Sequence, residues 1–298
     1  MHATEITIDT ALVQKLIAAQ FPHWAHLPIK PVEAGGWDNR TFHLGDTMSV
    51  RLPSAQRYAD KVHKELMWLP ILAPHLSIPI PQPIALGNPS ADYPWNWSIY
   101  RWLEGTSANV LPDSALNLPL IAQELGQFLQ ELHAIDATGV PLVGGPHNFY
   151  RGDSTKIYDA QTRKAITQLE GVIDTKAATA LWNKATSSEW NKKPVWIHGD
   201  LSAGNILINN AHLAAVIDFG GMGIGDPACD LVIAWTFFYG ESRKIFKSLV
   251  PLDPDTWTRA AGWALWKALI TLAALKDMQS SEALKQKQII NELIQEIL

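Results

Sequence analysis

Two short stretches in the second half of the chain restrict its fold more than any other feature. Residues 195–208 read VWIHGDLSAGNILI, and residues 215–220 read AVIDFG. The apolar, β-rich segments Ile206–Ile208 and Leu213–Ile217 flank Asn209-Asn210, a pair suited to a tight turn. The pattern therefore predicts an antiparallel hairpin.

Such a hairpin would bring three oxygen-bearing side chains together at one end of a two-stranded ribbon. Asn205 directly precedes the first strand, Asp218 directly follows the second, and Asp200 lies on the loop that leads into the pair. Oxygen ligands of this kind suit a hard cation such as Mg²⁺, which takes few protein ligands when phosphate oxygens supply the rest.

The order of these residues resembles a known catalytic pattern. His198-Gly199-Asp200-Leu201, then Asn205, then Ile217-Asp218-Phe219-Gly220 resembles the catalytic loop and metal-binding motif of protein kinases, with Gly199 in place of the usual Arg. With the later Gly225–Leu231, GDPACDL, the pattern is similar to that of the aminoglycoside phosphotransferase family, a kinase-like group. The match is specific because two spaced signatures must coincide in the right order.

The resemblance implies an α+β fold of the two-lobed, protein-kinase-like type. Residues 1–103 would form a nucleotide-binding small lobe with an antiparallel β-sheet and a hinge at about 101–103. Residues 104–298 would form a large, mostly helical lobe for catalysis and substrate binding. A length of 298 residues suits two such lobes.

The resemblance also implies a role for each motif residue. Asp200 would orient the acceptor hydroxyl and take up its proton, while Asn205 and Asp218 would hold the Mg²⁺ that bridges the nucleotide phosphates. His198 and Asp230 would support the site structurally, Asp230 through backbone hydrogen bonds. The alternative is that these are ordinary turn residues, which Asp, Asn and Gly often are; we prefer it for any one of them alone but not for the set.

A second group of residues is expected to bind the nucleotide. The Gly35-Gly36 bend could cover the phosphates, because glycine lets backbone N–H groups approach closely; a plain hairpin turn is the alternative. Arg51 occupies the place of the kinase strand Lys, with Glu65 of the predicted helix 55–68 as its partner. The alternative for this pair is an exposed strand Arg and a solvated helix Glu.

The hinge is expected where the last strand of the small lobe ends. By resemblance, Ser98–Tyr100 closes the sheet, and the backbone from Arg101 to Leu103 hydrogen-bonds the purine, with Tyr100 behind the pocket. A simple strand or core role for the aromatic side chains is equally compatible with this sequence.

The remaining expectations concern helices. Asp9 should cap a helix carrying Leu12, Val13, Leu16 and Ile17. Asp226 and Asp230 should open a helix that runs through Trp235 and Phe238. His133 is interpreted as a helix-end residue and Cys229 as a small buried side chain. Further helices are expected within 113–133, 154–191, 257–275 and 281–298.

Composition excludes several classes of protein. Hydrophobic residues make up 47% and charged residues 18% of the chain, as in globular proteins. The net charge of −5 argues against a nucleic-acid partner. The apolar run 262–275 is too short for a membrane span, and one cysteine cannot form an internal disulfide. We expect a cytoplasmic protein, a monomer or homodimer.

The sequence thus predicts a small-molecule kinase that moves the γ-phosphoryl of ATP or GTP to a substrate hydroxyl. The acceptor could be an aminoglycoside-type antibiotic, which would make the protein a resistance enzyme, or a related alcohol such as a macrolide. A metabolite kinase acting on choline or homoserine is the alternative. A nucleotide-binding pseudokinase and a metal-dependent phosphohydrolase are the rivals from other classes.

Overall fold

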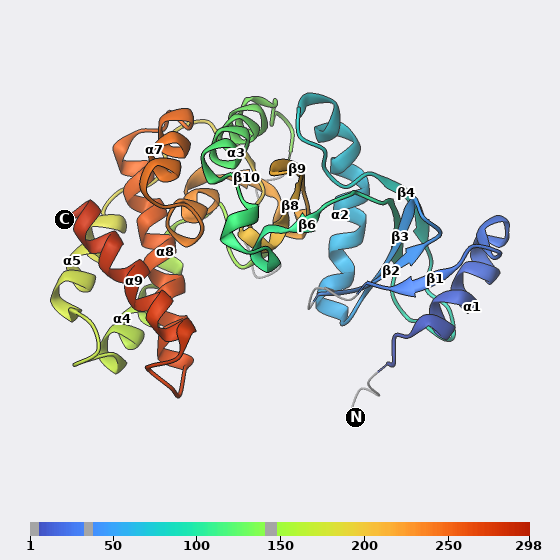
Figure 1. Cartoon of the computed structure of the whole chain (residues 1–298), viewed down its shortest axis with the longest axis horizontal. Helices are drawn as coiled ribbons and strands as arrows, with labels where there is room; N and C mark the ends of the chain where they lie inside the picture. Colours follow the sequence, from blue (N-terminus) through green and yellow to red (C-terminus); the bar gives the residue numbers. More distant parts are fainter. Residues whose placement is uncertain (1–5, 33–37, 141–147) are drawn as a thin grey trace. The chain divides into compact units, whose positions relative to one another are not determined.

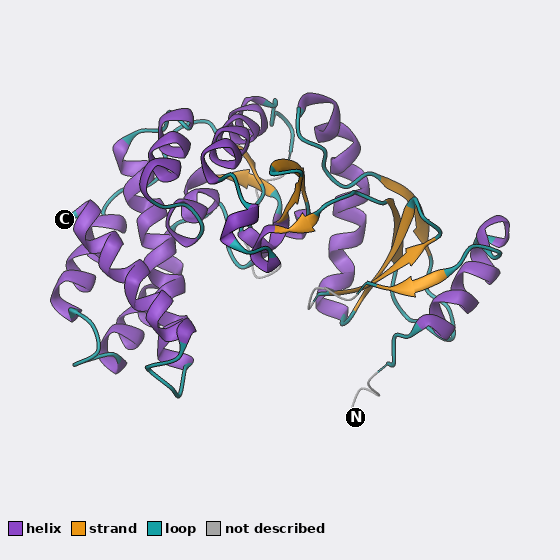
Figure 2. Cartoon of the chain, viewed as in Figure 1, coloured by secondary structure: helices purple, strands orange, loops and turns teal. Residues whose placement is uncertain are grey.

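The computed structural model describes residues 6–32, 38–140 and 148–298, and its elements are shown in Figures 1 and 2. By its contacts the chain divides into two compact units. The first unit is Met1–Glu104 with Ala215–Gly220, and the second is Gly105–Ala214 with Gly221–Leu298. The short segment that contains Asp218 therefore belongs with the first unit, although the chain around it belongs to the second.

The first unit is built on one antiparallel sheet of five strands in the order β1-β2-β3-β5-β4. Its helices and strands are α1 (Thr10–Gln20), β1 (Ile29–Pro31), β2 (Asn39–Leu44), β3 (Met48–Pro53), α2 (Gln56–Leu72), β4 (Pro83–Gly87) and β5 (Trp97–Arg101). The antiparallel sheet predicted for the N-terminal part is confirmed.

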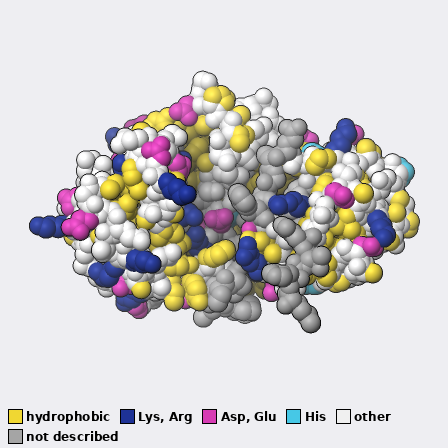
Figure 3. All heavy atoms as spheres, turned by 90° about the horizontal axis from the view of Figure 1, so that it is seen from below, with side chains coloured by type: hydrophobic (Ala, Val, Ile, Leu, Met, Phe, Trp, Pro, Cys, Tyr) yellow, Lys and Arg dark blue, Asp and Glu magenta, His cyan; other side chains and the backbone are white. Residues whose placement is uncertain are grey.

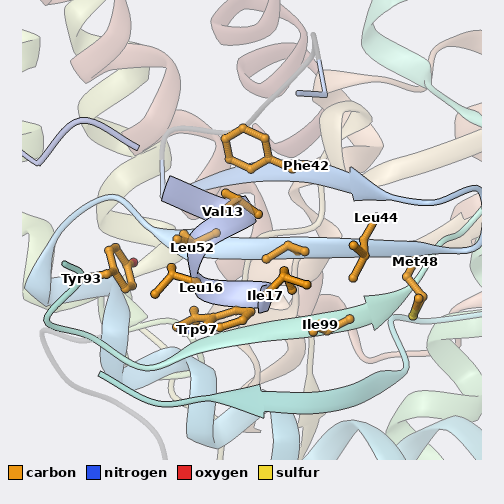
Figure 4. Packing of buried hydrophobic residues seen from close by; sticks show 11 residues of the cluster. Val13, Leu16, Ile17, Phe42, Leu44, Met48, Leu52, Tyr93, Trp97 and Ile99 are labelled. Carbon is orange, nitrogen blue, oxygen red and sulfur yellow. The ribbon is translucent and has the colours of Figure 1, made fainter. Parts of the chain in front are cut away.

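Helix α1 covers one face of this sheet. Asp9 caps it as predicted, because its Oδ1 accepts a hydrogen bond of 2.9 Å from the Leu12 backbone N–H. The apolar residues Val13, Leu16 and Ile17 are fully buried against the strands, as Figure 4 shows. The core residues that surround them are Phe42, Leu44, Met48, Val50, Leu52, Tyr93, Trp97 and Ile99.

Successive side chains of a strand point to opposite faces of the sheet, and this alternation sets the direction of Arg51 in β3. Val50 and Leu52 belong to the core beneath α1, so Arg51 between them faces the opposite side of the sheet. On that side Arg51 meets helix α2 through Glu65. The alternation in β3 therefore places one cation on the face that α1 leaves uncovered.

The second unit is mostly helical. Its helices and strands are β6 (Thr106–Ser107), α3 (Leu118–Ala134), α4 (Asp159–Gln168), α5 (Thr175–Ala185), β7 (Val195–Ile197), β8 (Ile206–Asn209), β9 (His212–Val216, whose last two residues group with the first unit), β10 (Gly223–Gly225), α6 (Ile233–Thr236), α7 (Gly240–Leu249), α8 (Pro254–Ala274) and α9 (Ser281–Ile297). Helix α8 is buried over most of its length and packs against α4, α5 and α9. The α+β class is confirmed.

The predicted hairpin is present, but its turn is Asn210-Ala211, one residue later than the predicted Asn209-Asn210. Strands β8 and β9 are neighbours in a sheet of order β6-β8-β9, and Asn210 and Ala211 of the turn adopt positive φ angles of 50° and 64°. A turn of this backbone conformation matches the right-handed twist of the strands that flank it.

Two expectations about helices need correction. The continuous helix predicted from Asp226 through Phe238 is instead a 3₁₀ segment, Pro227–Val232, followed by the four-residue α6. Within the 3₁₀ segment the Asp230 carboxylate is directed to the backbone of another segment, as described below. The predicted helix 55–68 extends to Leu72, with Pro70 inside it, and α7 was not predicted.

The surface carries charge of both signs. Figure 3 shows basic and acidic side chains interspersed on one face of the molecule. Among the described residues, no helix combines the length and the apolar character that a bilayer crossing requires.

Candidate active site

The loop that contains Asp200 is held by a buried carboxylate. Strand β7 ends at Ile197, and the backbone N–H groups of His198 and Gly199 donate hydrogen bonds of 2.6 and 2.8 Å to the two oxygens of Asp230. Asp230 is completely buried, and burial raises its pKa, while His198 and these backbone N–H groups lower it. One side chain thus fixes the first two residues of the loop.

Gly199 explains the departure from the kinase pattern. Its φ is +82°, a conformation that costs a residue with a Cβ atom free energy. A Cβ atom at this position would also lie 2.2 Å from the carbonyl oxygen of Gly221. Because both the backbone angle and the neighbouring peptide exclude a side chain, an Arg cannot occupy this position here.

Asp200 and Asn205 contact each other directly. The Asn205 Nδ2 donates to the Asp200 carbonyl oxygen at 2.8 Å and lies 3.4 Å from its Oδ2, and the Asp200 N–H donates to His198 Nδ1 at 3.1 Å. His198 is fully buried, whereas Asp200 is exposed. These contacts use the nitrogen of the Asn205 amide, and its oxygen accepts no hydrogen bond from any residue that the structure describes.

The first unit carries a network around Arg51. Arg51 Nη1 lies 3.3 Å from Glu65 Oε2, and Arg51 Nη2 lies 3.6 Å from Asp218 Oδ1. The Tyr100 hydroxyl donates to the same Glu65 oxygen. Burial alone would lower the pKa of Arg51, but the nearby Glu65, Tyr100 and Asp218 outweigh it and raise this pKa above its usual range. The guanidinium therefore remains charged.

The segment around Asp218 is strained and is held from α2. Asp218 has a φ of +63°, which a non-glycine residue adopts only when its surroundings impose it. Lys64 of α2 donates a hydrogen bond of 2.7 Å to the Gly220 carbonyl oxygen, and burial lowers the pKa of Lys64 to about 8. One turn earlier, Lys61 forms an ion pair of 2.6 Å with Asp38.

Sequence reasoning missed both lysines. The signal that could have found them is their position, because Lys61 and Lys64 lie at helical spacing from each other and beside Glu65 on one helix. Without the fold, however, two lysines on an amphipathic helix are typical of a solvated face.

For the other nucleotide-binding candidates, the contacts shown are backbone hydrogen bonds. Arg101 is exposed at the end of β5, and its N–H donates to the Gln82 carbonyl oxygen. Leu103 is half-buried and lies next to Trp102, whose N–H donates to the Thr47 carbonyl oxygen. The prediction for Gly35 and Gly36 falls on residues outside the described part of the chain.

A buried ion pair supports the GDPACDL motif. Asp226 caps the 3₁₀ segment through the Ala228 N–H, and its carboxylate binds Arg259 of α8, with Arg259 Nε at 2.6 Å. Burial raises the pKa of Asp226, and Arg259 opposes that shift. Cys229 of the same motif is buried, as predicted, and burial raises its pKa well above the ordinary value.

The donor atoms suit a hard divalent cation. Asn205 offers its amide oxygen and Asp218 its carboxylate, and oxygen donors of this kind are those that Mg²⁺ prefers. In the described part of the chain, no cluster of three or more His, Cys, Asp or Glu side chains is placed to hold a metal. The expected Mg²⁺ site includes only one protein carboxylate, so it would not form such a cluster.

The predicted residues therefore form two groups, one in each unit. His198, Asp200, Asn205 and Asp230 are connected in the second unit, and Arg51, Glu65 and Asp218 in the first. The convergence of Asp200 and Asn205 with Asp218 stays a prediction.

Comparison with known proteins gives a family match over most of the chain. Residues 29–285 match the model of a family described as the phosphotransferase enzyme family. A search of curated proteins finds no significant match.

Three solved structures that resemble this chain are phosphotransferases. A GDP complex of wild-type aminoglycoside 2'-phosphotransferase-IIIa superposes with a TM-score of 0.70 at 20% identity, covering 98% of this chain and 100% of that one. A streptomycin–ATP complex of APH(2")-IIa gives 0.59 at 17% identity, with 97% of each chain covered. The macrolide 2'-phosphotransferase of Brachybacterium faecium gives 0.61 at 19% identity, covering 95% and 98%.

Proposed function

Because the chain belongs to the phosphotransferase enzyme family, we propose that it transfers the γ-phosphoryl group of ATP or GTP to a hydroxyl group of a small molecule. The observation that carries the proposal is the connection of His198, Gly199, Asp200 and Asn205 through the buried Asp230, within a chain that matches the family over residues 29–285. Both donors stay open, since similar structures hold GDP or ATP.

Asp200 is the proposed proton acceptor. Its carboxylate is exposed and would receive the proton of an acceptor hydroxyl, while its backbone N–H donates to His198 and its carbonyl accepts from Asn205. Phosphoryl transfer depends mostly on positioning and on neutralising charge, so a carboxylate with a fixed backbone suits the task.

Arg51, Asn205 and Asp218 are proposed to hold the nucleotide. Arg51 is a permanent cation that can donate two hydrogen bonds to phosphate oxygens. Asn205 and Asp218 would hold Mg²⁺, which when bound neutralises negative charge on the phosphates. Glu65 orients Arg51, and the backbone of Arg101–Leu103 would bind the purine. Gly35 and Gly36 would cover the phosphates.

The acceptor could belong to any of several classes of alcohol. Aminoglycosides and macrolides are candidates because similar structures are named aminoglycoside and macrolide 2'-phosphotransferases. A metabolite alcohol such as choline or homoserine is the second candidate, because the sequence motifs concern the donor side and leave the acceptor open.

The experiment is a transfer screen with purified protein, Mg²⁺ and either ATP or GTP. Aminoglycosides, macrolides and metabolite alcohols would be incubated separately, and products would be identified by a mass gain of one phosphoryl group. The Asp200→Asn variant is the matched control. Nucleotide binding without transfer to any alcohol would indicate a pseudokinase, and phosphate release without an acceptor would indicate a hydrolase.

We further propose a cytoplasmic location, because the donor nucleotides are cytoplasmic metabolites and the single thiol, Cys229, is buried and free. The proposed assembly is a monomer or homodimer, which sedimentation of the purified protein would distinguish.

A further inference from the structure

One cation of the second unit lies on an aromatic surface. The Arg151 guanidinium carbon is 4.9 Å from the ring centroid of Trp263 and 5.3 Å from that of Trp266. Tyr158 stacks on Trp266 with a centroid distance of 4.0 Å and an interplanar angle of 21°. Arginine stacked on indole rings is held by cation–π attraction without using its N–H groups.

The aromatic surface is itself fixed in place. Trp263 and Trp266 belong to the buried helix α8 and are 1% and 6% exposed. The Trp266 indole N–H donates to Gln161 at 2.9 Å, and the Tyr158 hydroxyl donates to the Phe149 carbonyl oxygen at 2.9 Å. The guanidinium therefore rests on a rigid support.

Arg151 differs from the other three arginines of the second unit. Arg163, Arg243 and Arg259 each form an ion pair with at least one carboxylate. Arg259 also lies near an indole, that of Trp190, yet it pairs with Asp226. Arg151, by contrast, forms no ion pair and donates no side-chain hydrogen bond with any residue that the structure describes; its charge lowers the pKa of the buried Asp230, and it is only half-buried.

The position of Arg151 connects it to the catalytic loop. The carbonyl oxygen of the next residue, Gly152, accepts a hydrogen bond of 2.8 Å from the Asp226 N–H. Gly152 has a φ of +82°, and a Cβ atom on it would lie 2.7 Å from Cδ1 of Ile197, the residue immediately before His198. Arg151 is thus anchored beside the strand that leads into the loop containing Asp200.

We propose that Arg151 binds an oxyanion of the acceptor, so that the substrate is an alcohol that also carries a carboxylate or a phosphate group. The planar guanidinium presents N–H donors at its edge, and two of them can bind two oxygens of one anionic group. A fixed cation beside the loop would disfavour a polycationic aminoglycoside. This inference rests on the proposed phosphotransferase function.

The test uses small acceptors that carry a carboxylate, a phosphate or no anionic group. Glycerate, glycerol phosphate and glycerol share a hydroxyl-bearing skeleton, and kanamycin is the polycationic comparison. Their binding would be measured by calorimetry and their phosphorylation by steady-state kinetics, for the parent and for Arg151→Gln and Arg151→Lys. Arg163→Gln, which removes a cation already paired with Asp159, is the matched control.

In the parent, at least one anionic acceptor should bind about tenfold or more tightly than glycerol, the scale of a charge-assisted hydrogen bond. The Arg151→Gln variant should lose this preference through KM, Arg151→Lys should restore part of it, and Arg163→Gln should keep it.

Three results would overturn the inference. These are a parent preference for glycerol or kanamycin, binding of neither anionic acceptor, or an equal loss for all acceptors in Arg151→Gln. The last would mean that Arg151 only stabilises the ionised Asp230. Transfer to kanamycin alone would contradict the role of Arg151 and leave the proposed function intact. Anion binding without transfer to any alcohol would contradict the proposed function but not anion binding by Arg151.

Discussion

The Arg51 network permits a quantitative prediction of coupling. Glu65 is 5% exposed, and its Oε2 receives both Arg51 Nη1 at 3.3 Å and the Tyr100 hydroxyl. Removing one partner of a buried ion pair leaves an uncompensated charge, which costs about 3–5 kcal/mol. We therefore expect Arg51→Met to lower the free energy of unfolding of the first unit by about 3 kcal/mol.

The second substitution should relieve part of this cost. Glu65→Gln keeps an oxygen that can accept from Tyr100 and removes the charge, so it should cost about 1–2 kcal/mol when Arg51 is present. In the double variant no buried carboxylate is left unpaired. Its loss should be smaller than the sum of the single losses by roughly 2 kcal/mol, within the range measured for residues of one network.

Two measurements check this prediction. Urea unfolding, followed by hydrogen exchange in β3 and α2, gives the coupling energy, and nucleotide titration gives the effect on binding. Arg51→Lys retains the charge but loses the planar fork, so nucleotide affinity should fall about tenfold. Lys15→Met, which removes an exposed pair with Asp92, is the control. Additive losses within about 0.5 kcal/mol, together with parental affinity in Arg51→Lys, would refute the reasoning.

Four further predictions follow from the second unit. Asp200→Asn should reduce transfer by at least ~10²-fold with little change in nucleotide affinity, measured by kinetics and titration. Gly199→Ala should lower the melting temperature and abolish transfer, because its Cβ atom would lie 2.2 Å from a carbonyl oxygen; normal activity would contradict the geometry. Arg259→Leu should destabilise the fold by about 3–5 kcal/mol in urea, since it leaves Asp226 buried and unpaired. Burial lowers the pKa of His133 to about 4 from 6.5, so below pH 6.5 the unfolded chain binds a proton that the folded chain rejects. Stability should therefore fall from pH 6.5 to 4 by up to about 3 kcal/mol, and His133→Gln should flatten that decline in urea titrations at each pH.

Local patterns were sufficient to predict much of the fold. The β8–β9 hairpin followed from two apolar runs around a turn pair, and α1 followed from Asp9 and the helical spacing after it. The helix predicted through Phe238 is instead a 3₁₀ segment followed by α6, and the contacts of Asp230 within it lie far away in the sequence. Asp230 binds the backbone at His198 and Gly199, and no local pattern records a partner 31 or 32 residues away.

The parts of the site that sequence reasoning missed are tertiary contacts. Lys64 reaches Gly220 across 156 positions in the chain. The stacking of Arg151 on Trp263 likewise joins segments far apart in the sequence. A charged residue reveals its partner only when the fold brings the two segments together, so the motifs suggest candidates for the reacting groups but not the residues that hold them.

The strained backbone at Asp218 depends on contacts from two neighbouring elements, β3 and α2. A non-glycine residue at φ +63° costs about 1–3 kcal/mol, and it persists only where neighbouring groups impose it. Here the neighbours are Arg51, which faces the carboxylate, and Lys64, which holds the Gly220 carbonyl. Lys64 and Glu65 are adjacent on α2, and Glu65 positions Arg51. A shift of α2 along its axis would therefore displace the proposed phosphate-binding cation and release the strained segment at the same time.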